Sequence, residues 1–244
     1  REAGATALQE LAFTIADAVE YVKAALKIGL DIDDFAPRLS FFFASQMNIM
    51  EEAAKFRAAR KLWAEIMEED FDAKKEKSKL LRFHTQTAGT ALTAEQPLNN
   101  IIRVTIQSLA EVLGGTQSLH TNSYDEALSL PSEEAVEIAL RTQQIIAEES
   151  GIADVIDPLG GSYCLEELTA SFVESTKEYL EKIDKLGGMV EAIKVGYVQK
   201  EIQDSAYQKQ KEIDEDKEIV VGIKKYRWGH HNEEMDLLKV DPDL

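Results

Sequence analysis

Three short apolar segments alternate with longer amphipathic segments in the first 150 residues, and this alternation restricts the fold more than any other feature. The predicted strands span 37–43, 79–85 and 117–122. The segments around them are predicted helices, at 8–29, 48–69, 95–113 and 132–151. Strands that alternate with helices form a parallel sheet, either open or closed into a barrel. The sequence therefore predicts an α/β fold for residues 1–150.

The helices are predicted from the spacing of their apolar residues. In the first helix, apolar residues recur every three or four positions, as on one buried face, and Gly29 ends the pattern. The same reasoning predicts the buried face of helix 95–113, which consists of Leu98, Ile101, Ile102, Leu109 and Val112. Polar residues interrupt these positions, so each helix is expected to pack against the sheet along a single stripe.

The chain beyond residue 150 has a different pattern. Two further helices are predicted at 165–186 and 188–215, with two glycines between them, and a short strand at 218–223. The tail from 226 to 244 has no regular pattern. We therefore expect a partial barrel at 1–150, helices packed on it at 151–217, and a short strand with an irregular tail at 218–244.

The composition excludes several classes of partner. Asp and Glu number 45 against 27 Lys and Arg, a formal charge of −18, whereas nucleic acids and anionic membranes attract basic surfaces. No apolar run approaches the roughly 20 residues that span a bilayer. No apolar signal segment opens the chain, and its one cysteine, Cys164, fits a reducing compartment, where we expect it to be buried. These features predict a cytoplasmic protein without membrane or nucleic-acid partners.

Polar residues cluster near the ends of the predicted strands. Arg38 and Ser40 are two residues apart and would share one face of a strand, and His84 and Gln86 would do the same. The third strand carries the polar residues Gln117, His120 and Asn122. Ligands of parallel α/β proteins bind at the carboxyl ends of the strands, so this set predicts hydrogen bonding to a large polar ligand.

Each of these residues also has a structural interpretation. Arg38 would pair with Asp33 or Asp34, and His84 would be a buried core histidine. Gln117 and Asn122 would be turn or capping residues. Neither a glycine-rich phosphate motif nor a paired nucleophile and base is present. The pair His230-His231 is more typical of a polar surface than of a metal site, so no metal site is predicted.

Six segments of the chain resemble one family of enzymes. The matching stretches are REAGA at 1–5, FAPRLSFF at 35–42, RFHTQTAG at 82–89, GTQSLHTN at 115–122, DEA at 125–127 and DPLGGSY at 157–163. In this order they resemble the acyl-CoA mutase family that includes the large subunit of methylmalonyl-CoA mutase. Together the matches extend over nearly the whole chain, and collinear matches of this length are specific.

The resemblance implies a fold and a chemistry. Members of the family use adenosylcobalamin to rearrange the carbon skeleton of an acyl-CoA by radical chemistry. Their (β/α)₈ barrel holds CoA along its axis, and the corrin caps the carboxyl ends of its strands. By resemblance the acyl-CoA would be bound by Arg38, Ser40, His84, Gln86 and Gln117. The corrin would be bound by Glu2, Gly89, Glu126, Ala127 and Leu130. The implied reaction interconverts methylmalonyl-CoA and succinyl-CoA, with isobutyryl-, 2-hydroxyisobutyryl- or ethylmalonyl-CoA as alternative substrates.

The chain lacks several features of the family pattern: most of the barrel strands, the residues that bind the acyl group and the motif of the lower cobalt ligand. Three predicted strands are fewer than the eight of a barrel, so we expect the C-terminal half of a TIM barrel with a helical extension. The residues that bind the acyl group are expected upstream of this chain, and catalytic residues within it are unknown. No histidine lies in the family's Asp-x-His-x-x-Gly motif, so another domain or chain would supply the lower cobalt ligand.

These departures predict partners and a competing role. The expected partners are an N-terminal barrel half and a small cobalamin-binding subunit, and the chain alone is expected to be catalytically silent. Self-association through the unpaired edges of the sheet is the alternative to a barrel partner. In that case the chain would be a structural or assembly component without chemistry of its own.

Overall fold

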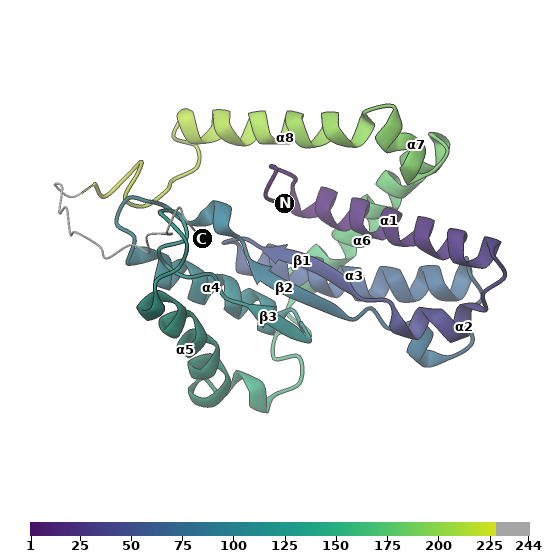
Figure 1. Cartoon of the computed structure of the whole chain (residues 1–244), viewed down its shortest axis with the longest axis horizontal. Helices are drawn as coiled ribbons and strands as arrows, with labels where there is room; N and C mark the ends of the chain where they lie inside the picture. Colours follow the sequence, from purple (N-terminus) through teal and green to yellow (C-terminus); the bar gives the residue numbers. More distant parts are fainter. Residues whose placement is uncertain (228–244) are drawn as a thin grey trace, which may run out of the picture.

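The computed structural model describes residues 1–227 and has an α/β architecture (Figure 1). The strands are β1 (Phe41–Ser45), β2 (Phe83–Thr87) and β3 (Ser118–His120). The helices are α1 (Ala7–Lys27), α2 (Ile32–Phe35), α3 (Ile49–Glu69), α4 (Asn99–Leu113), α5 (Glu133–Glu149), α6 (Tyr163–Lys185), α7 (Met189–Lys194) and α8 (Tyr197–Asp214). Short 3₁₀ turns join several of them. The predicted fold class is confirmed at this level.

Side-chain caps explain where the long helices begin. Thr6 and Gln9 form a reciprocal capping box at the start of α1, in which each side chain accepts a hydrogen bond from the other's backbone N–H. Asn48 caps α3 and Ser132 caps α5 in the same manner, each accepting from a backbone N–H in the first turn. The predicted starts of these helices are therefore correct to within a residue.

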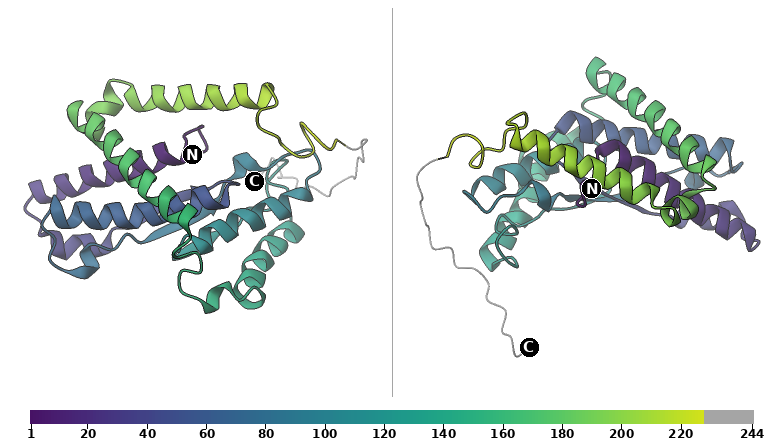
Figure 2. Two further views of the ribbon diagram at one scale, coloured as in Figure 1. Left: turned by 180° about the vertical axis from the view of Figure 1, so that it is seen from behind. Right: turned by 90° about the horizontal axis from the view of Figure 1, so that it is seen from above.

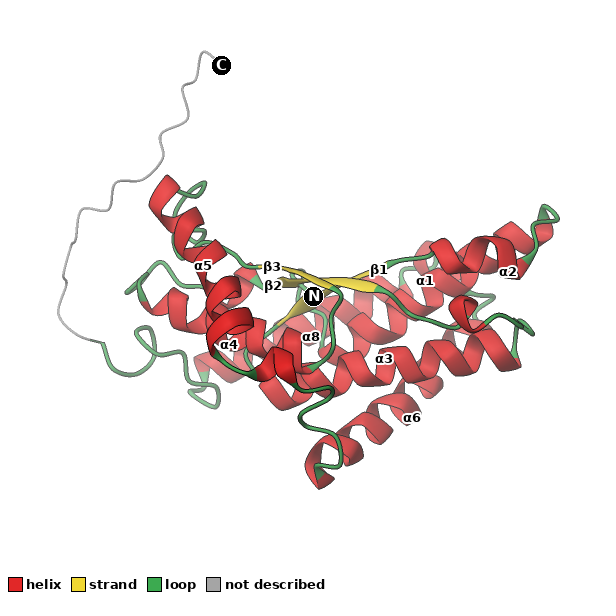
Figure 3. Cartoon of the chain, turned by 90° about the horizontal axis from the view of Figure 1, so that it is seen from below, coloured by secondary structure: helices red, strands yellow, loops and turns green. Residues whose placement is uncertain are grey.

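The three strands form one parallel sheet in the order β1-β2-β3. Figure 3 shows α3 and α4 on one side of this sheet. The rings of Phe43, Phe56 and Phe83 meet between the sheet and α3, with centroids 5.3–6.0 Å apart, and Trp63 packs edge-on against Phe41. On the opposite face of the sheet the side chains are half-exposed or exposed, except that of Ala44. A parallel sheet covered by helices on one face fits part of a barrel.

All three strands are shorter or later than predicted. Residues 36–38 form a 3₁₀ turn with Pro37 in its first positions, so β1 begins only at Phe41. A second 3₁₀ turn at Glu76–Ser78 and an extended linker precede β2, which starts at Phe83. Apolar residues before β1 and β2 misled the prediction, because Leu39 and Leu81 pack against the core although they lie outside the strands. Arg38 and Ser40 consequently lie outside the strand that was expected to contain them.

The prediction for the buried face of α4 is wrong. Leu98 is 53% exposed and Ile102 is 61% exposed. The face that packs on the sheet is polar and includes Asn100, Arg103 and Gln107, all buried. Asn100 donates to the backbone carbonyls of Thr93 and Tyr124, so hydrogen bonds replace apolar contact here. The spacing of apolar residues cannot reveal a buried helix face that is largely polar, as in α4.

The C-terminal segment packs back onto the first helices. Helix α6 crosses α1 and α3 (Figure 2). The helix predicted at 188–215 is two helices, because Gly196 adopts a left-handed φ of 79° between them. The strand predicted at 218–223 does not form, and Val221 instead makes an isolated bridge to Lys225. The predictions for His230-His231 and for most of the tail lie outside the described residues.

Cys164 lies in the first turn of α6 and is exposed, so the prediction that it is buried is wrong. Within residues 1–227, no helix has the length and apolar character needed to cross a bilayer. No group of three or more His, Cys, Asp and Glu side chains in that range is arranged to hold a metal ion.

Candidate functional site

The open face of the sheet presents two rows of side chains across the strands. Phe42, His84 and Ser118 are level with one another. The next row is Ala44, Gln86 and His120. Alternate residues of β2 are buried against the helices, which leaves His84 and Gln86 together on the open side, as the sequence predicts. This face is the candidate site.

An aromatic pair lies at the centre of the open face. The rings of Phe42 and His84 are stacked, with centroids 5.5 Å apart, and Phe42 is 55% exposed. The Nδ1 atom of His84 lies 2.8 Å from the hydroxyl oxygen of Ser118. His84 is half-exposed, so the alternative interpretation as a buried core histidine is wrong. Neither Phe42 nor Ser118 was identified from the sequence as a site residue.

A chain of amides leads from this face to the carboxyl edge of the sheet. Gln86 donates to the side-chain oxygen of Asn122 at 3.1 Å, and Asn122 donates to Glu126 at 3.1 Å. The backbone N–H of Asn122 also donates to the hydroxyl of Thr87 at 2.9 Å. The side chain of Asn122 therefore bridges Gln86 and Glu126 instead of capping a helix or turn, and it connects two groups of predicted site residues.

Three predicted corrin residues come together at the carboxyl edge. A Cβ on Gly89 would lie 2.7 Å from Glu126 Oε1, so glycine at this position makes room for the carboxylate. Burial, followed by the charges of Glu2 and Asp125, raises the pKa of Glu126 above its ordinary value. Glu2 is therefore near Glu126. The space beside Gly89 is thus taken by the side chain of Glu126.

Ala127 and Leu130, the remaining predicted corrin residues, lie in the loop that follows β3. Both are exposed, Leu130 to 58%, and Leu128 beside them is 38% exposed. An exposed apolar loop next to two carboxylates forms a mixed surface at the carboxyl edge. All five predicted corrin residues thus lie at this edge or in its loops.

The expectation that the polar residues gather at the carboxyl ends of the strands is wrong for three of them. Arg38, Ser40 and Gln117 precede their strands and lie at the amino edge of the sheet. The side-chain oxygen of Gln117 accepts from the backbone N–H of Phe83 at 2.7 Å, and its amide donates to Gly115 O at 3.1 Å. This geometry supports the capping interpretation of Gln117, and its contact with a ligand stays a prediction.

Arg38 is exposed and makes no hydrogen bond or ion pair with any residue in the range 1–227. The proposed structural partners are occupied. Asp33 accepts from the backbone of Lys74 and Lys75 and from Ser78, and Asp34 pairs with Lys75. The structural interpretation of Arg38 is therefore wrong, and its guanidinium remains available to an anion.

The candidate residues extend over the whole length of the sheet. Arg38 and Ser40 lie at the amino edge, His84 and Gln86 lie along the face, and Gly89 and Glu126 lie at the carboxyl edge. A strand rises about 3.3 Å per residue, so a ligand in contact with both edges must be about 20 Å long. The open face suits an elongated polar ligand rather than a compact one.

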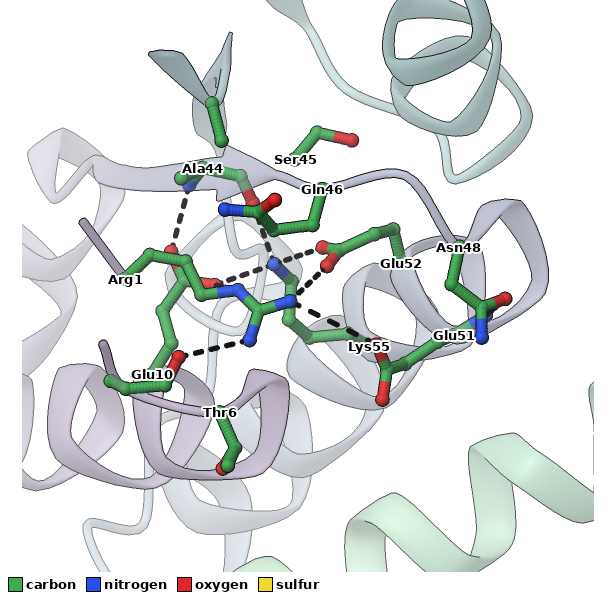
Figure 4. A network of polar contacts seen from close by, with 12 residues as sticks. Arg1, Thr6, Glu10, Ala44, Ser45, Gln46, Asn48, Glu51, Glu52 and Lys55 are labelled. Atoms are coloured by element: carbon green, nitrogen blue, oxygen red, sulfur yellow. Dashed lines mark hydrogen bonds and ion pairs between the residues drawn. The ribbon is translucent and has the colours of Figure 1, made fainter. Parts of the chain in front are cut away.

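A buried charged network lies beside β1 and was not predicted from the sequence (Figure 4). Lys55 is fully buried and donates to Glu10 at 2.5 Å, to Glu52 and to the carbonyl of Ala44. Arg1 donates to Glu52 at 2.5 Å. Burial alone would raise the pKa of Glu52, but the charges of Lys55 and Arg1 lower it below its ordinary value. The network holds α1, α3 and β1 together.

One further carboxyl group is buried behind the sheet. Glu111 of α4 is fully buried, and neither of its carboxyl oxygens has a hydrogen-bond partner in the described part of the chain. Burial raises its pKa to about 8. This group is therefore protonated at neutral pH, which removes the cost of a buried charge.

Comparisons with known proteins identify the family of the chain. A family model described as methylmalonyl-CoA mutase matches residues 1–244. The chain belongs to the methylmalonyl-CoA mutase family. It is 51% identical to the probable mitochondrial methylmalonyl-CoA mutase of Caenorhabditis elegans over 99% of this chain and 32% of that protein. It is 48% identical to the methylmalonyl-CoA mutase of Escherichia coli over 98% of this chain and 33% of the relative.

A relative with another substrate in its name is equally similar. The 2-hydroxyisobutanoyl-CoA mutase large subunit of Aquincola tertiaricarbonis is 49% identical over 99% of this chain and 42% of that subunit. The chain thus spans about a third to two-fifths of the length of these family members. The resemblance recognised in the sequence is confirmed at the level of the family.

Proposed function

We propose that this chain contributes the open sheet face to an adenosylcobalamin-dependent mutase that interconverts methylmalonyl-CoA and succinyl-CoA. The observation that carries the proposal is the arrangement of the face. Arg38, without a partner among residues 1–227, lies at one edge, His84 and Gln86 lie along the face, and the Glu126 cluster lies at the other edge. An acyl-CoA has the required length, with phosphates at one end and a reactive acyl group at the other.

In this proposal the fold is the C-terminal half of a (β/α)₈ barrel. Residues 1–150 form the partial barrel, 151–217 are helices packed upon it, and 218–244 are the remaining C-terminal segment. Three parallel strands with helices on one face support this division, because the bare face would become the inner wall of a closed barrel. An N-terminal barrel half supplies the remaining strands.

The proposed roles follow from where each side chain lies. Arg38 holds a phosphate or carboxylate with its planar fork, and Ser40 adds a hydroxyl at the same edge. His84 and Gln86 bind and orient the ligand in the middle of the barrel. Gln117 binds the ligand from the start of β3, next to its bonds to Phe83 and Gly115. Residues that act on the acyl group lie in the other barrel half, since no nucleophile and base are paired on this face.

The carboxyl edge fits a large cofactor with polar substituents. Glu126 is held by Asn122 and its pKa is raised by burial, and Glu2 is near it, so two acidic side chains can accept from amide or hydroxyl donors. Exposed Ala127 and Leu130 offer apolar contact to a flat ring. Glu2, Gly89, Glu126, Ala127 and Leu130 would hold adenosylcobalamin, which supplies the radical chemistry when bound. A small cobalamin-binding subunit or another domain provides the lower cobalt ligand.

A related acyl-CoA is the second candidate substrate. The 49% identity to the 2-hydroxyisobutanoyl-CoA mutase large subunit favours it, because this value is as high as that of the methylmalonyl-CoA mutases. The name of that relative also supports a partner subunit. We place this mutase in the cytoplasm, as its composition predicts, although several relatives are named as mitochondrial.

Complementation tests the proposed function. The chain is mixed with a polypeptide that contains the rest of the Escherichia coli relative, together with adenosylcobalamin and methylmalonyl-CoA. We expect succinyl-CoA from the mixture and none from the chain alone, and we expect Arg38→Ala in the mixture to raise KM at least tenfold. Turnover by the chain alone, or a mixture that assembles, binds adenosylcobalamin and stays inactive with every acyl-CoA of the family, would contradict the proposal.

A further inference from the structure

A pocket of about 460 Å³ lies between α3 and the first turns of α6, and we refer to it as the α3–α6 pocket. Figure 3 shows α6 on the side of α3 that faces away from the sheet, so α3 and the sheet separate this pocket from the open face. Its cations are Arg57, Arg60 and Lys61, which share one side of α3. Asp157 and Glu166 are the carboxylates that line it.

Both carboxylates of the pocket bind the same cation. Arg57 Nη1 donates to the two carboxylate oxygens of Asp157 at 2.6 and 2.5 Å, and Arg57 Nη2 donates to Glu166 at 2.7 Å. Burial alone would lower the pKa of Arg57, but these two partners raise it above its ordinary value. The backbone N–H of Gly161 also donates to Glu166 at 3.0 Å. The charges of Asp157 and Glu166 are therefore directed to Arg57.

Arg60 is half-buried without an acidic partner. Its Nη1 atom donates to the backbone carbonyls of Gly114 and Gly115. Its Nε and Nη2 atoms have no hydrogen-bond partner among residues 1–227, and no carboxylate in that range forms an ion pair with it. Burial, followed by the charge of Arg57, lowers the pKa of Arg60 below its ordinary value. An anion in the pocket would relieve both unfavourable effects on this guanidinium.

The charge to be neutralised matches that of a phosphate group. Lys61 is exposed and forms no ion pair with residues 1–227, so Arg60 and Lys61 each contribute one uncompensated positive charge. A phosphate group carries close to two negative charges above its second pKa of about 6, whereas a carboxylate carries one. The Nε and Nη2 atoms of Arg60 lie along one edge of the guanidinium, and this edge can hold two phosphate oxygens in parallel.

The pocket is also larger than a phosphate group alone. Thr169 and Ala170 of α6 line the wall opposite the cations, and the hydroxyl of Thr169 is occupied by a bond to Leu165 O at 2.7 Å. This wall offers small side chains without charge. A small organic substituent on the phosphate can therefore lie against α6 while the phosphate meets α3.

We propose that the α3–α6 pocket binds a phosphate group, either as inorganic phosphate or as the phosphomonoester of a small molecule, with Arg60 as its bidentate donor and Lys61 as its second cation. Arg57 assists by holding Asp157 and Glu166 away from these two side chains. The residues of this site are distinct from those proposed for the acyl-CoA and for the corrin. The inference thus goes beyond the proposed function and does not depend on it.

Nuclear magnetic resonance titration of the full chain tests the site, with inorganic phosphate and glycerol 3-phosphate as separate probes at constant ionic strength. We expect the Arg60 Nε–H and the backbone amides of Thr169 and Ala170 to shift together and to saturate with either probe. Tighter binding of glycerol 3-phosphate supports a phosphomonoester, and tighter binding of inorganic phosphate supports the free ion. Signals that stay in place, or that shift no more than with sodium chloride, would overturn the inference.

The same titration of Arg38→Ala separates this pocket from the proposed acyl-CoA site, since Arg38 also lacks a partner among residues 1–227. We expect the signals of Thr169 and Ala170 to saturate at the same phosphate concentration as in the wild type. Loss of these shifts in Arg38→Ala would assign phosphate binding to the open face and overturn the inference.

Variants of the two cations measure their contributions. Arg60→Met should weaken phosphate binding by about tenfold or more, as expected for charge-assisted hydrogen bonds. Lys61→Met removes an exposed side chain that has no bond to maintain in the described chain, so it tests the site without disturbing the fold. It should weaken binding about threefold, whereas Lys200→Met on α8, the matched exposed control, should leave it unchanged. Equal affinities of Lys61→Met and Lys200→Met would contradict the assignment of the second cation.

A gain of affinity provides the sharpest test. Glu166→Gln removes a negative charge from the pocket and keeps an oxygen that can accept from Arg57 and from Gly161. It should bind phosphate about two- to fivefold more tightly, because Arg57 is left with one carboxylate and its charge contributes to the pocket. Glu167→Gln, the next residue on α6, is the control and lies outside the pocket lining. Binding that is unchanged or weaker in Glu166→Gln would overturn the inference.

Discussion

The two faces of the sheet have charged and polar side chains in different environments: buried on the covered face and exposed or half-exposed on the open one. The face covered by α3 and α4 contains Glu52, Lys55 and Glu111, all fully buried and either paired or protonated. The open face carries His84 and Gln86, which are half-exposed, and Arg38 at its amino edge is exposed and has no partner in the described chain. A buried charge needs a partner inside the protein to offset its loss of hydration. An exposed charge stays hydrated, so it can remain without a protein partner and bind a ligand. The difference indicates that the covered face maintains the fold, and it supports the proposal that the open face binds a ligand.

The largest test of this comparison removes a buried charge. Lys55→Met should leave Glu52 and Glu10 without their shared cation and lower the free energy of unfolding by about 3–5 kcal/mol. Urea denaturation measures the change. The control is Lys177→Met, which breaks an exposed pair with Glu65 and should cost about 0–1 kcal/mol. Equal losses in the two variants would show that the network contributes no more than a surface pair.

Glu111 on the covered face should make the free energy of unfolding depend on pH. Burial raises its pKa from 4.5 in the unfolded chain to about 8, so the folded state binds a proton that the unfolded state has released. This contribution is complete below pH 4.5 and is lost as the pH rises to about 8, at about 1.4 kcal/mol per pH unit. Glu111→Gln should remove this slope relative to the wild type.

Urea midpoints at several pH values between 5 and 9 measure this effect. Because other carboxylates titrate in both proteins, the difference between wild type and variant isolates Glu111. Parallel curves throughout this range would mean that the carboxyl group is already ionised in the fold.

A smaller effect is expected from the open face, and it should appear in binding instead of stability. Arg38→Ala should change the free energy of unfolding by less than about 0.5 kcal/mol, because the side chain has no partner among residues 1–227. In the assembled mutase it should weaken acyl-CoA binding at least tenfold, as expected for a charge-assisted hydrogen bond. Calorimetric titration measures the affinity, with Arg141→Ala on α5 as the control. A loss of stability without a loss of affinity would place Arg38 with the covered face.

The smallest effect concerns the support of a single side chain. Ser118→Ala removes the hydroxyl next to His84 Nδ1 and should cost about 1 kcal/mol or less. Nitrogen chemical shifts of the His84 ring should report a change in the ratio of its two neutral tautomers. An unchanged ratio would mean that Ser118 does not orient the imidazole.

Sequence reasoning identified part of the open face and missed the buried charges of the covered one. The spacing of His84 and Gln86 on one face follows from strand periodicity and is confirmed. Lys55 and Glu111 lie on amphipathic helices, where charged residues normally indicate the solvated side. Their burial depends on partners distant in the chain, such as Glu10 for Lys55, and no local pattern reveals such a partner.

The starts of the strands were a second feature that the sequence did not predict correctly. Arg38 and Ser40 were predicted to share one face of a strand, but the turn at Pro37 leaves both outside β1, at the amino edge of the sheet. Local apolar density does not distinguish a strand from a well-packed turn before it. The family resemblance identified these residues without their position, and only the fold shows that the candidate site extends along the whole sheet.

The central claim is that the open face, and not the covered one, meets the ligand. Its most direct test is a nuclear magnetic resonance titration of the assembled mutase with an acyl-CoA, in which the side chains of His84, Gln86 and Lys55 are observed together. We predict that the His84 ring and Gln86 amide signals shift and saturate with the ligand while the Lys55 ammonium signal stays in place. Saturable binding that leaves His84 and Gln86 unchanged would contradict the claim.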